Sequence, residues 1–392
     1  MIYLDNNATT QPDPRVVDAM LPYLRDQYAN PSSPYRTGRR TARAIFEARE
    51  RVANLIFAAS RDILFTSGGT EGNNSALHSA LYARPDCRRI VVSAVEHASV
   101  LEWVRAKSDQ GYDVVEIPMD GEGRLDIEAL DHAVDKNTVI VSVMLANNET
   151  GILLPIREVV GIAGKYGVPV HCDAVQGVGK ISVDISSMGV QFLTISAHKF
   201  HGPKGIGALW IQPGMRFIPY LFGGGQELGR RGGTENVASI VGFGEAAKLA
   251  AEQLHKMDDS VRLLRDKLTQ SLLSRISGSR LHGGQSPRLP NTAHLSLSGV
   301  EAEILISMLD REGIYCSTGS ACMAGSPEPS HVLQAMGVDP PILRESVRFG
   351  LSRFTTQQEI DQAIETIVCL VKKLQSMPSE EEGDTRQSTR PS

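Results

Sequence analysis

Short apolar runs bounded by turn residues alternate with helical patterns between residues 62 and 211. Several of the runs, such as Arg89–Ala94 and Thr138–Leu145, are nearly continuous in Val, Ile and Leu, which is typical of strands buried on both faces of a sheet. This alternation predicts an α/β fold with a mostly parallel, seven-stranded sheet. The expected strands are Asp62–Thr66, Arg89–Ala94, Val114–Pro118, Thr138–Leu145, Val168–Cys172, Phe192–Ser196 and Ile206–Ile211. The expected helices between them are Gly38–Phe57, Glu71–Ala83, Ser99–Gln110, Ile127–Val134 and Ile156–Tyr166.

The pattern changes after Asn236, where a long helical region continues to about Ser277. A strand at Thr292–Leu297 and helices near Ala302–Glu312 and Gln357–Leu374 follow, and they predict a smaller α+β domain. We therefore expect a large domain over 16–256 and a small domain over 257–377, with residues 1–15 packing on the small one. The tail 378–392 has no apolar anchors, so we expect it to be disordered.

Composition excludes several classes of protein. The net charge of the 392-residue chain is −5 with both signs mixed, which argues against a nucleic-acid binder. No signal peptide opens the sequence and its longest apolar run, near Val139–Ala146, is too short to span a bilayer, so we expect a cytoplasmic protein without a membrane partner. The five cysteines form no C-x-x-C pair, which favours neither a disulfide framework nor a structural zinc site.

A lysine and an aspartate lie directly after two of the expected strands. Ser196-Ala197-His198-Lys199 closes one strand and His171-Cys172-Asp173 closes another. Open α/β sheets bind ligands beyond the carboxyl ends of their strands. Lysine can form a Schiff base with a carbonyl cofactor, and a carboxylate can keep a pyridine nitrogen protonated. A surface-loop lysine and a helix-capping aspartate are the alternatives.

Two further motifs suit a flat, phosphorylated ligand. The small residues of Ser67-Gly68-Gly69-Thr70-Glu71 precede a helix, where backbone N–H groups bind anions, although a plain turn would have the same pattern. His97 follows a strand and could stack on a ring or move a proton, or be structural. The spacing of His198 and His201 is too weak to indicate a metal.

A cysteine and an arginine in the last quarter complete the candidates. Cys322 lies among small residues, Gly319-Ser320-Ala321 before it and Ala324-Gly325-Ser326 after it. An exposed thiolate in such a segment could reach a substrate, or the thiol could be a bystander. Arg348, in the strand-like run Ser346–Gly350, could grip a carboxylate through its guanidinium fork, or form a structural ion pair.

In this order along one chain, the motifs resemble those of cysteine desulfurases of the nitrogen-fixation and iron–sulfur-cluster type. The resemblance extends over nearly the whole chain, to Arg353-Phe354-Thr355-Thr356. Further matching stretches are Tyr3-Leu4-Asp5-Asn6-Asn7-Ala8-Thr9-Thr10, Asn30-Pro31-Ser32-Ser33, Ala146-Asn147-Asn148-Glu149-Thr150-Gly151, Arg231-Gly232-Gly233-Thr234-Glu235-Asn236 and Glu328-Pro329-Ser330-His331.

The resemblance implies a homodimeric, pyridoxal-phosphate-dependent transferase of fold type I. In that family's pattern Lys199 would bind the cofactor covalently. Asp173 would pair with the pyridine nitrogen, Gln176 would bond the ring hydroxyl, and His97 would stack on the ring as a catalytic residue. The residues expected at the phosphate end of the cofactor are Gly69, Thr70, Ser196, His198 and, from the other subunit, Thr234.

The same resemblance implies the reaction. Asn148 and Arg348 would hold the carboxylate of L-cysteine, and Cys322 would take its sulfur as a persulfide, leaving L-alanine. The sulfur would go to an acceptor such as an iron–sulfur scaffold, for cluster assembly, nitrogen fixation or other sulfur transfer. No metal site is implied beyond a transient contact of Cys322 with an iron–sulfur cluster. A selenocysteine lyase, another fold-type I enzyme and a scaffold that lost its chemistry are the alternatives.

Two residues depart from the family's pattern. Met323 stands where Thr or Ser usually follows the cysteine, and Pro327 stands where Leu is usual. Proline fixes one backbone angle and Met323 adds apolar bulk beside the thiol. Neither change removes a chemical group, so we expect activity to survive.

Overall fold

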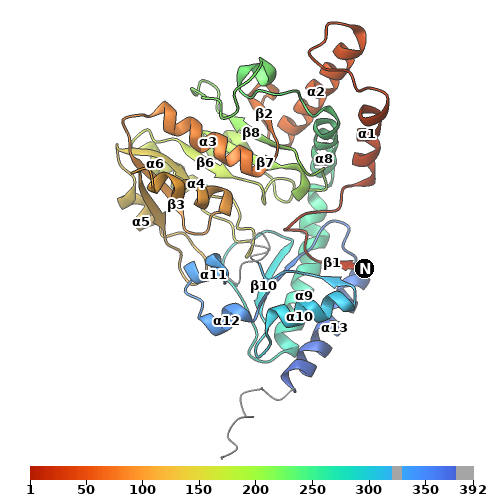
Figure 1. Cartoon of the computed structure of the whole chain (residues 1–392). Helices are drawn as coiled ribbons and strands as arrows, with labels where there is room; N and C mark the ends of the chain where they lie inside the picture. Colours follow the sequence, from red (N-terminus) through yellow and green to blue (C-terminus); the bar gives the residue numbers. More distant parts are fainter. Residues whose placement is uncertain (320–328, 377–392) are drawn as a thin grey trace, which may run out of the picture.

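The computed structural model describes residues 1–319 and 329–376. These residues form a large lobe around a seven-stranded sheet and a small lobe around a three-stranded sheet, and the two lie end to end (Figure 1). The expected disordered tail 378–392 lies outside the described residues. None of the described helices is long and apolar enough to cross a membrane.

The large sheet has the strand order β2-β8-β7-β6-β5-β3-β4. Its strands are β2 (Ile63–Thr66), β3 (Arg89–Ser93), β4 (Asp113–Ile117), β5 (Thr138–Ser142), β6 (Val170–Asp173), β7 (Phe192–Ser196) and β8 (Gly207–Ile211). Only β8 is antiparallel to its neighbours β2 and β7; the other pairings in the sheet are parallel. The predicted α/β class and the seven-stranded, mostly parallel sheet are therefore confirmed.

Alternate residues of the large sheet belong to two separate apolar cores. Ile90 and Val92 pack into one core, and Val91, between them, packs into the other. Successive side chains of a strand point to opposite faces, so this strand is buried on both sides. That burial explains why the strand sequences are continuously apolar.

Helices cover both faces of the large sheet (Figure 1). They are α1 (Pro14–Arg25), α2 (Arg36–Leu55), α3 (Gly69–Ala83), α4 (Ala98–Ser108), α5 (Ile127–Ala133), α6 (Ile156–Gly164), α7 (Ile185–Met188) and α8 (Val237–Lys256). Single-turn 3-10 segments lie at Ser60–Asp62, Ala197–Lys199 and Gln226–Gly229. The sequence analysis did not predict α1, which Asp13 caps by accepting a hydrogen bond from the Arg15 backbone N–H.

The small lobe has its own apolar core. Its antiparallel sheet has the order β12 (Ser346–Gly350), β10 (Thr292–Ser296), β9 (Arg280–Leu281). The helices around it are α9 (Arg262–Arg275), α10 (Ala302–Arg311) and α13 (Gln357–Gln375). The short helices α11 (His331–Ala335) and α12 (Pro340–Arg344) pack their buried residues into a core of the large lobe. A π-helical turn, Met257–Val261, joins α8 of the large lobe directly to α9.

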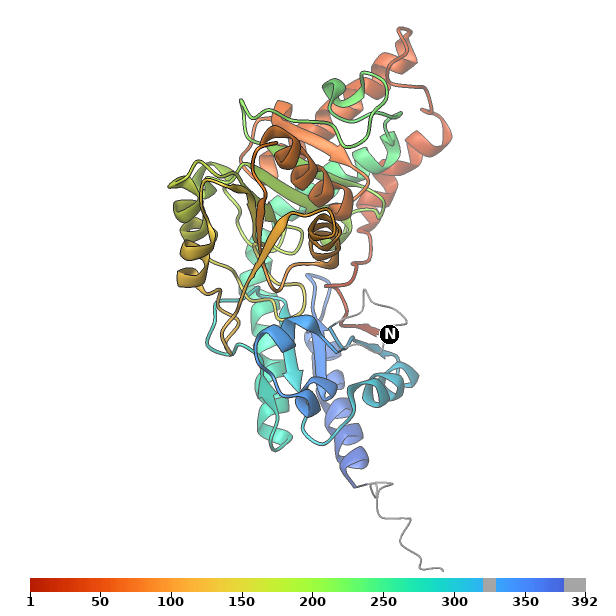
Figure 2. The same ribbon diagram turned by 60° about the vertical axis from the view of Figure 1, so that its left-hand side comes forward.

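The N-terminal strand β1 (Ile2–Tyr3) belongs to the small lobe, where it pairs in parallel with β11 (Ile314–Tyr315). Ile2 and Leu4 are buried in the small-lobe core. The chain then passes between the lobes and enters α1, so residues 5–10 lie at their junction (Figure 2).

Candidate active site

A pocket of about 200 Å³ opens at the carboxyl ends of the central strands, at the junction of the two lobes. It brings together ten residues that the sequence analysis singled out, from segments far apart in the chain. They are Gly69, Thr70, His97, Asn148, Asp173, Gln176, Ser196, His198, Lys199 and Arg348. Thr234 is exposed and is not among the lining residues of this pocket. Cys322 lies outside the described residues.

Lys199 lies in the single helical turn that follows β7. Its Nζ donates hydrogen bonds to the backbone carbonyls of Asn7 at 2.7 Å and Ala8 at 2.8 Å. The N-terminal segment therefore holds the amine at the edge of the large sheet, where open α/β sheets place ligands.

Asp173 ends β6, the strand beside β7. One carboxylate oxygen accepts from the Asn73 side chain at 2.7 Å, and the other accepts from the Val175 backbone N–H at 2.9 Å. Each carboxylate oxygen can accept about two hydrogen bonds, so the group keeps the capacity to accept an N–H from a ligand in the pocket.

His97 caps α4 and is linked to Asp173 through side chains. Its Nδ1 accepts from the Ser99 backbone N–H at 3.1 Å, which leaves the proton of the neutral ring on Nε2. Asn73 donates both to Ser99 Oγ, at 2.9 Å, and to Asp173. The network fixes the orientation of the imidazole and of the carboxylate together.

The end of the pocket nearest α3 suits an anion. Gly69 and Thr70 form the first turn of α3, and the N-terminus of a helix attracts negative charge. Ser196 Oγ is buried there and has no hydrogen-bond partner among residues 1–319 and 329–376. Burial lowers the pKa of His198 to about 4, with the charge of Lys199 adding to the effect, so His198 is neutral at pH 7. An unpartnered buried hydroxyl and a helix N-terminus fit a phosphate group.

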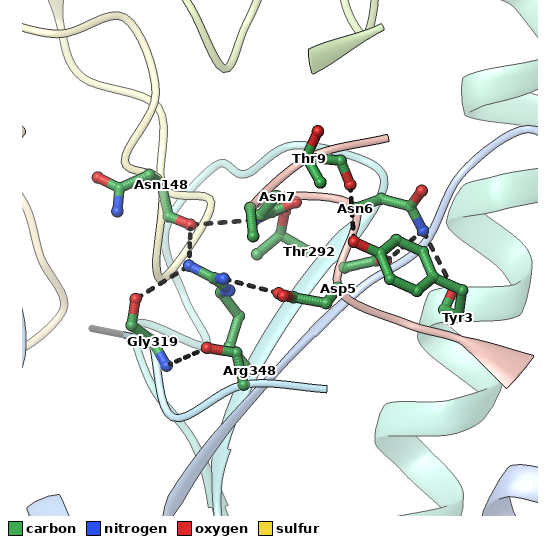
Figure 3. Close-up of polar contacts among 12 residues, drawn as sticks. Tyr3, Asp5, Asn6, Asn7, Thr9, Asn148, Thr292, Gly319 and Arg348 are labelled. Carbon is green, nitrogen blue, oxygen red and sulfur yellow. Dashed lines mark hydrogen bonds and ion pairs between the residues drawn. The ribbon is translucent and has the colours of Figure 1, made fainter. Parts of the chain in front are cut away.

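Arg348 crosses from β12 of the small lobe to the far side of the pocket, and its side chain is 2% exposed. Nη1 donates to the backbone carbonyls of Asn148 at 3.2 Å and Gly319 at 3.0 Å, and Nη2 pairs with Asp5 at 2.8 Å (Figure 3). Arg348 Nε and Asn148 Oδ1 are buried without a partner among the described residues. The arginine thus connects the two lobes, and its Nε N–H remains available to a ligand in the pocket.

A buried carboxyl group adjoins His97. Glu96 accepts hydrogen bonds on Oε1 from Ser93 Oγ and from the Met144 backbone N–H. Burial raises the pKa of Glu96 to about 8, because a charge there would lose its hydration. The side chain is therefore largely protonated at neutral pH.

Sequence reasoning missed several residues that line the pocket. Asn73 and Ser99 connect Asp173 to His97, and Asn7 accepts from Lys199. Asn73 lies three residues after Thr70, so the helical spacing alone would have placed it on the same face of α3. No comparable signal in the sequence points to the backbone carbonyl of Asn7. Among the described residues, no group of acidic, histidine or cysteine side chains is placed to hold a metal ion.

Fold and pocket together define an α/β protein with a lysine and an aspartate in one pocket at the edge of a mostly parallel sheet. The chain belongs to the aminotransferase class-V family, which it matches over residues 2–363. Enzymes of this family depend on pyridoxal phosphate. The lysine amine, the aspartate carboxylate and the anion-binding end described above fit that cofactor.

Similar proteins carry more specific names. The chain is 46% identical over 377 residues to a cysteine desulfurase of Trichormus azollae, covering 96% of this chain and 94% of that protein. It is 42% identical to the cysteine desulfurase NifS of Azotobacter vinelandii, with the same coverage. A solved NifS-like protein matches with a TM-score of 0.88 and 36% identity, covering 95% of this chain and 99% of that one. The fold predicted from the resemblance is thereby confirmed.

Proposed function

We propose that this protein is a cysteine desulfurase that converts L-cysteine to L-alanine and passes the sulfur on as a persulfide. The observation that carries the proposal is the placement of Lys199 and Asp173 at the ends of adjacent strands, beside an anion-binding helix start in one pocket. The names of the relatives at 42–46% identity support the choice of substrate.

The pocket residues would hold the cofactor from several sides. Lys199 would form the covalent link, Asp173 would accept the pyridine N–H, and Gln176 would donate to the ring oxygen. The Nε2 proton and the fixed ring of His97 suit stacking and proton transfer. Gly69, Thr70, Ser196 and His198 would bind the phosphate. Bound pyridoxal phosphate supplies an electron-withdrawing ring that stabilises negative charge on the α-carbon of the substrate.

Lys199 would then act as the base. With the substrate bound in the pocket, the lysine amine would remove the proton from the α-carbon of L-cysteine. The carbonyls of Asn7 and Ala8 fix the direction of the amine. Asn148 of the large lobe and Arg348 of the small lobe both line the pocket. They would hold the substrate carboxylate, with Arg348 donating its Nε N–H.

Cys322 would accept the sulfur. Its thiolate would attack the substrate sulfur, so that a sulfur–sulfur bond forms as the carbon–sulfur bond breaks. The electron pair of the broken bond stays on the three-carbon fragment, which leaves as L-alanine after taking up protons. A thiol of ordinary pKa, about 8.5, is mostly protonated at pH 7, so we expect a positive charge in the pocket to favour the thiolate.

We also infer a homodimer, in which Thr234 would complete the phosphate site of the second subunit. Thr234 is exposed in its own chain, and two nearby apolar side chains, Phe222 and Leu228, are 80% and 79% exposed. Large exposed apolar side chains of this kind are typical of protein interfaces. Three further points stay predictions. They are a sulfur-acceptor protein as partner, the cytoplasmic location, and the domain boundaries at 15/16, 256/257 and 377/378.

The test is the conversion of L-cysteine to L-alanine by the purified holoenzyme. Cys322→Ala should keep the visible absorbance of the bound cofactor and lose alanine formation. Cys369→Ala, which removes an exposed thiol on α13, serves as the matched control and should retain activity. Substantial turnover by Cys322→Ala would show that the sulfur acceptor is a different residue.

A further inference from the structure

A second lysine, Lys180, is buried directly behind the pocket. It lies in the turn after β6, four residues beyond Gln176, and the residue is 5% exposed. Its Nζ donates a hydrogen bond to Gln176 Oε1 at 2.6 Å. Lys180 and Lys199 line the same small cavity of about 20 Å³, so both residues border one water-sized space.

The surroundings of Lys180 do not explain its burial. The charged or titratable groups that reach it are Lys199 and Arg348, together with the rings of His198 and His201. Burial, with the charges of Lys199 and Arg348 adding to it, lowers the pKa of Lys180 well below its usual value. No carboxylate among the described residues forms an ion pair with it. An apolar side chain of the same length would avoid this desolvation cost, which points to a role in the site.

The contacts of Gln176 show what that role is. Its Nε2 donates to the backbone carbonyl of Asn7 at 3.0 Å, and the same carbonyl accepts from Lys199 at 2.7 Å. A backbone carbonyl can only accept, so the Gln176 group that faces Asn7 is the NH2 group, and the amide oxygen accepts from Lys180. The amide of Gln176 is therefore fixed at both ends, with its oxygen toward Lys180 and its NH2 group toward the pocket.

We propose that Lys180 is a positioning residue that locks the amide of Gln176 so that its second N–H faces the ring oxygen of the cofactor. The inference rests on the proposed function, because it requires pyridoxal phosphate in the pocket. Without the lysine, only the Asn7 carbonyl would hold the amide, which could then rotate so that its second N–H no longer faces the ring oxygen.

A Gln176 N–H held in this orientation should change the proton affinity of the bound cofactor. A hydrogen bond donated to the ring oxygen lowers the basicity of that oxygen, which shares a proton with the nitrogen that joins the cofactor to Lys199. Loss of the donor should therefore raise the pH at which this proton leaves. It should also weaken cofactor binding.

The test uses the holoenzyme and needs neither cysteine nor Cys322. Lys180→Met should raise the pH midpoint of the visible absorbance change by about one unit and weaken cofactor binding about tenfold, since one pH unit corresponds to a tenfold change in equilibrium. Lys180→Gln retains an N–H donor without the charge, so its midpoint should lie closer to that of the wild type. Lys204→Met removes an exposed charge near His198 and should leave the midpoint unchanged.

A double-mutant cycle with Gln176→Leu separates positioning from charge. If Lys180 acts through Gln176, Lys180→Met should produce little further shift once Gln176 has been replaced. An equal shift in both backgrounds, or no shift in Lys180→Met, would overturn the proposal. A wild-type protein that binds no pyridoxal phosphate would instead overturn the proposed function.

Discussion

Replacing Arg348 by Lys should lower both stability and activity, for separate reasons. The guanidinium donates to three acceptors, the carbonyls of Asn148 and Gly319 and the carboxylate of Asp5. A lysine keeps the positive charge but lacks the fork that reaches acceptors on several sides. It would retain the Asp5 pair at best and leave the buried Gly319 carbonyl without its donor, while the Asn148 carbonyl would keep only its hydrogen bond from the Asn7 side chain.

The magnitude follows from these contacts. The Gly319 carbonyl loses its donor, which costs about 1–3 kcal/mol, and the lost hydrogen bond to the Asn148 carbonyl costs about 0.5–1.5 kcal/mol. The free energy of unfolding should therefore fall by about 2–4 kcal/mol. The substitution also removes the Nε N–H that we expect to bind the substrate carboxylate. A lost hydrogen bond to a charged group costs about 1.5–3 kcal/mol. For the substrate carboxylate, that loss corresponds to a roughly 10–100-fold decrease in kcat/KM.

Urea denaturation of the holoenzyme measures the first effect, and alanine formation at varied cysteine concentration measures the second. Arg353→Lys is the matched control. Arg353 is 5% exposed and pairs with Asp13 at 2.8 Å, but it does not line the main pocket. It should lose stability and keep kcat/KM. If Arg348→Lys is destabilised with an unchanged kcat/KM for cysteine, Arg348 is a structural brace and the substrate assignment is wrong.

Three further outcomes are expected. Lys199→Ala should fold and lose the absorbance of the covalently bound cofactor; a normal spectrum would contradict its assignment. Hydrogen bonds from Arg15 and Arg353 hold the pKa of Asp13 well below its usual range, so its contribution to stability is present above about pH 4 and is lost as the pH falls further. Asp13→Asn should therefore lower the free energy of unfolding at pH 7 by about 3–5 kcal/mol, and by roughly 1 kcal/mol less at pH 3, in urea titrations at the two pH values. Because the pKa of Glu96 is raised to about 8, the folded state binds the extra proton and stability falls as the pH rises toward 8. Glu96→Gln should flatten that decline in thermal unfolding between pH 6 and pH 9, and an unchanged slope would refute the assignment.

The central sheet could be predicted because strands that are buried on both faces have apolar sequences, and this pattern is visible without the structure. In Thr138–Ser142 every residue is buried and the three inner residues are Val, Ile and Val, since both faces are covered. The strands β1, β9 and β11 have two residues each, too few to show a period, and their existence depends on partners distant in the sequence. The helix α1 was missed although Asp13-Pro14 is a recognisable start signal.

Some residues of the candidate site could likewise be predicted from the sequence, and others could not. Lys199, Asp173 and the turn before α3 follow strands directly, so local sequence places them at one edge of the sheet. The ion pair between Arg348 and Asp5 joins opposite ends of the chain, and only the packing of the two lobes brings them together. The amide of Gln176 was singled out through the resemblance, whereas its partner Lys180 carried no signal because lysine is usually exposed.

The crossing of residues 5–10 between the lobes has a consequence for synthesis on the ribosome. The strand β1 pairs with β11, which is synthesised much later, so residues 2–3 cannot take their place in the sheet until β11 has been made. Domains otherwise tend to form in the order of translation. The carbonyls of Asn7 and Ala8 that orient Lys199 are thus synthesised well before the strand that anchors their segment, and a nascent chain can complete the pocket only after β11 has been made.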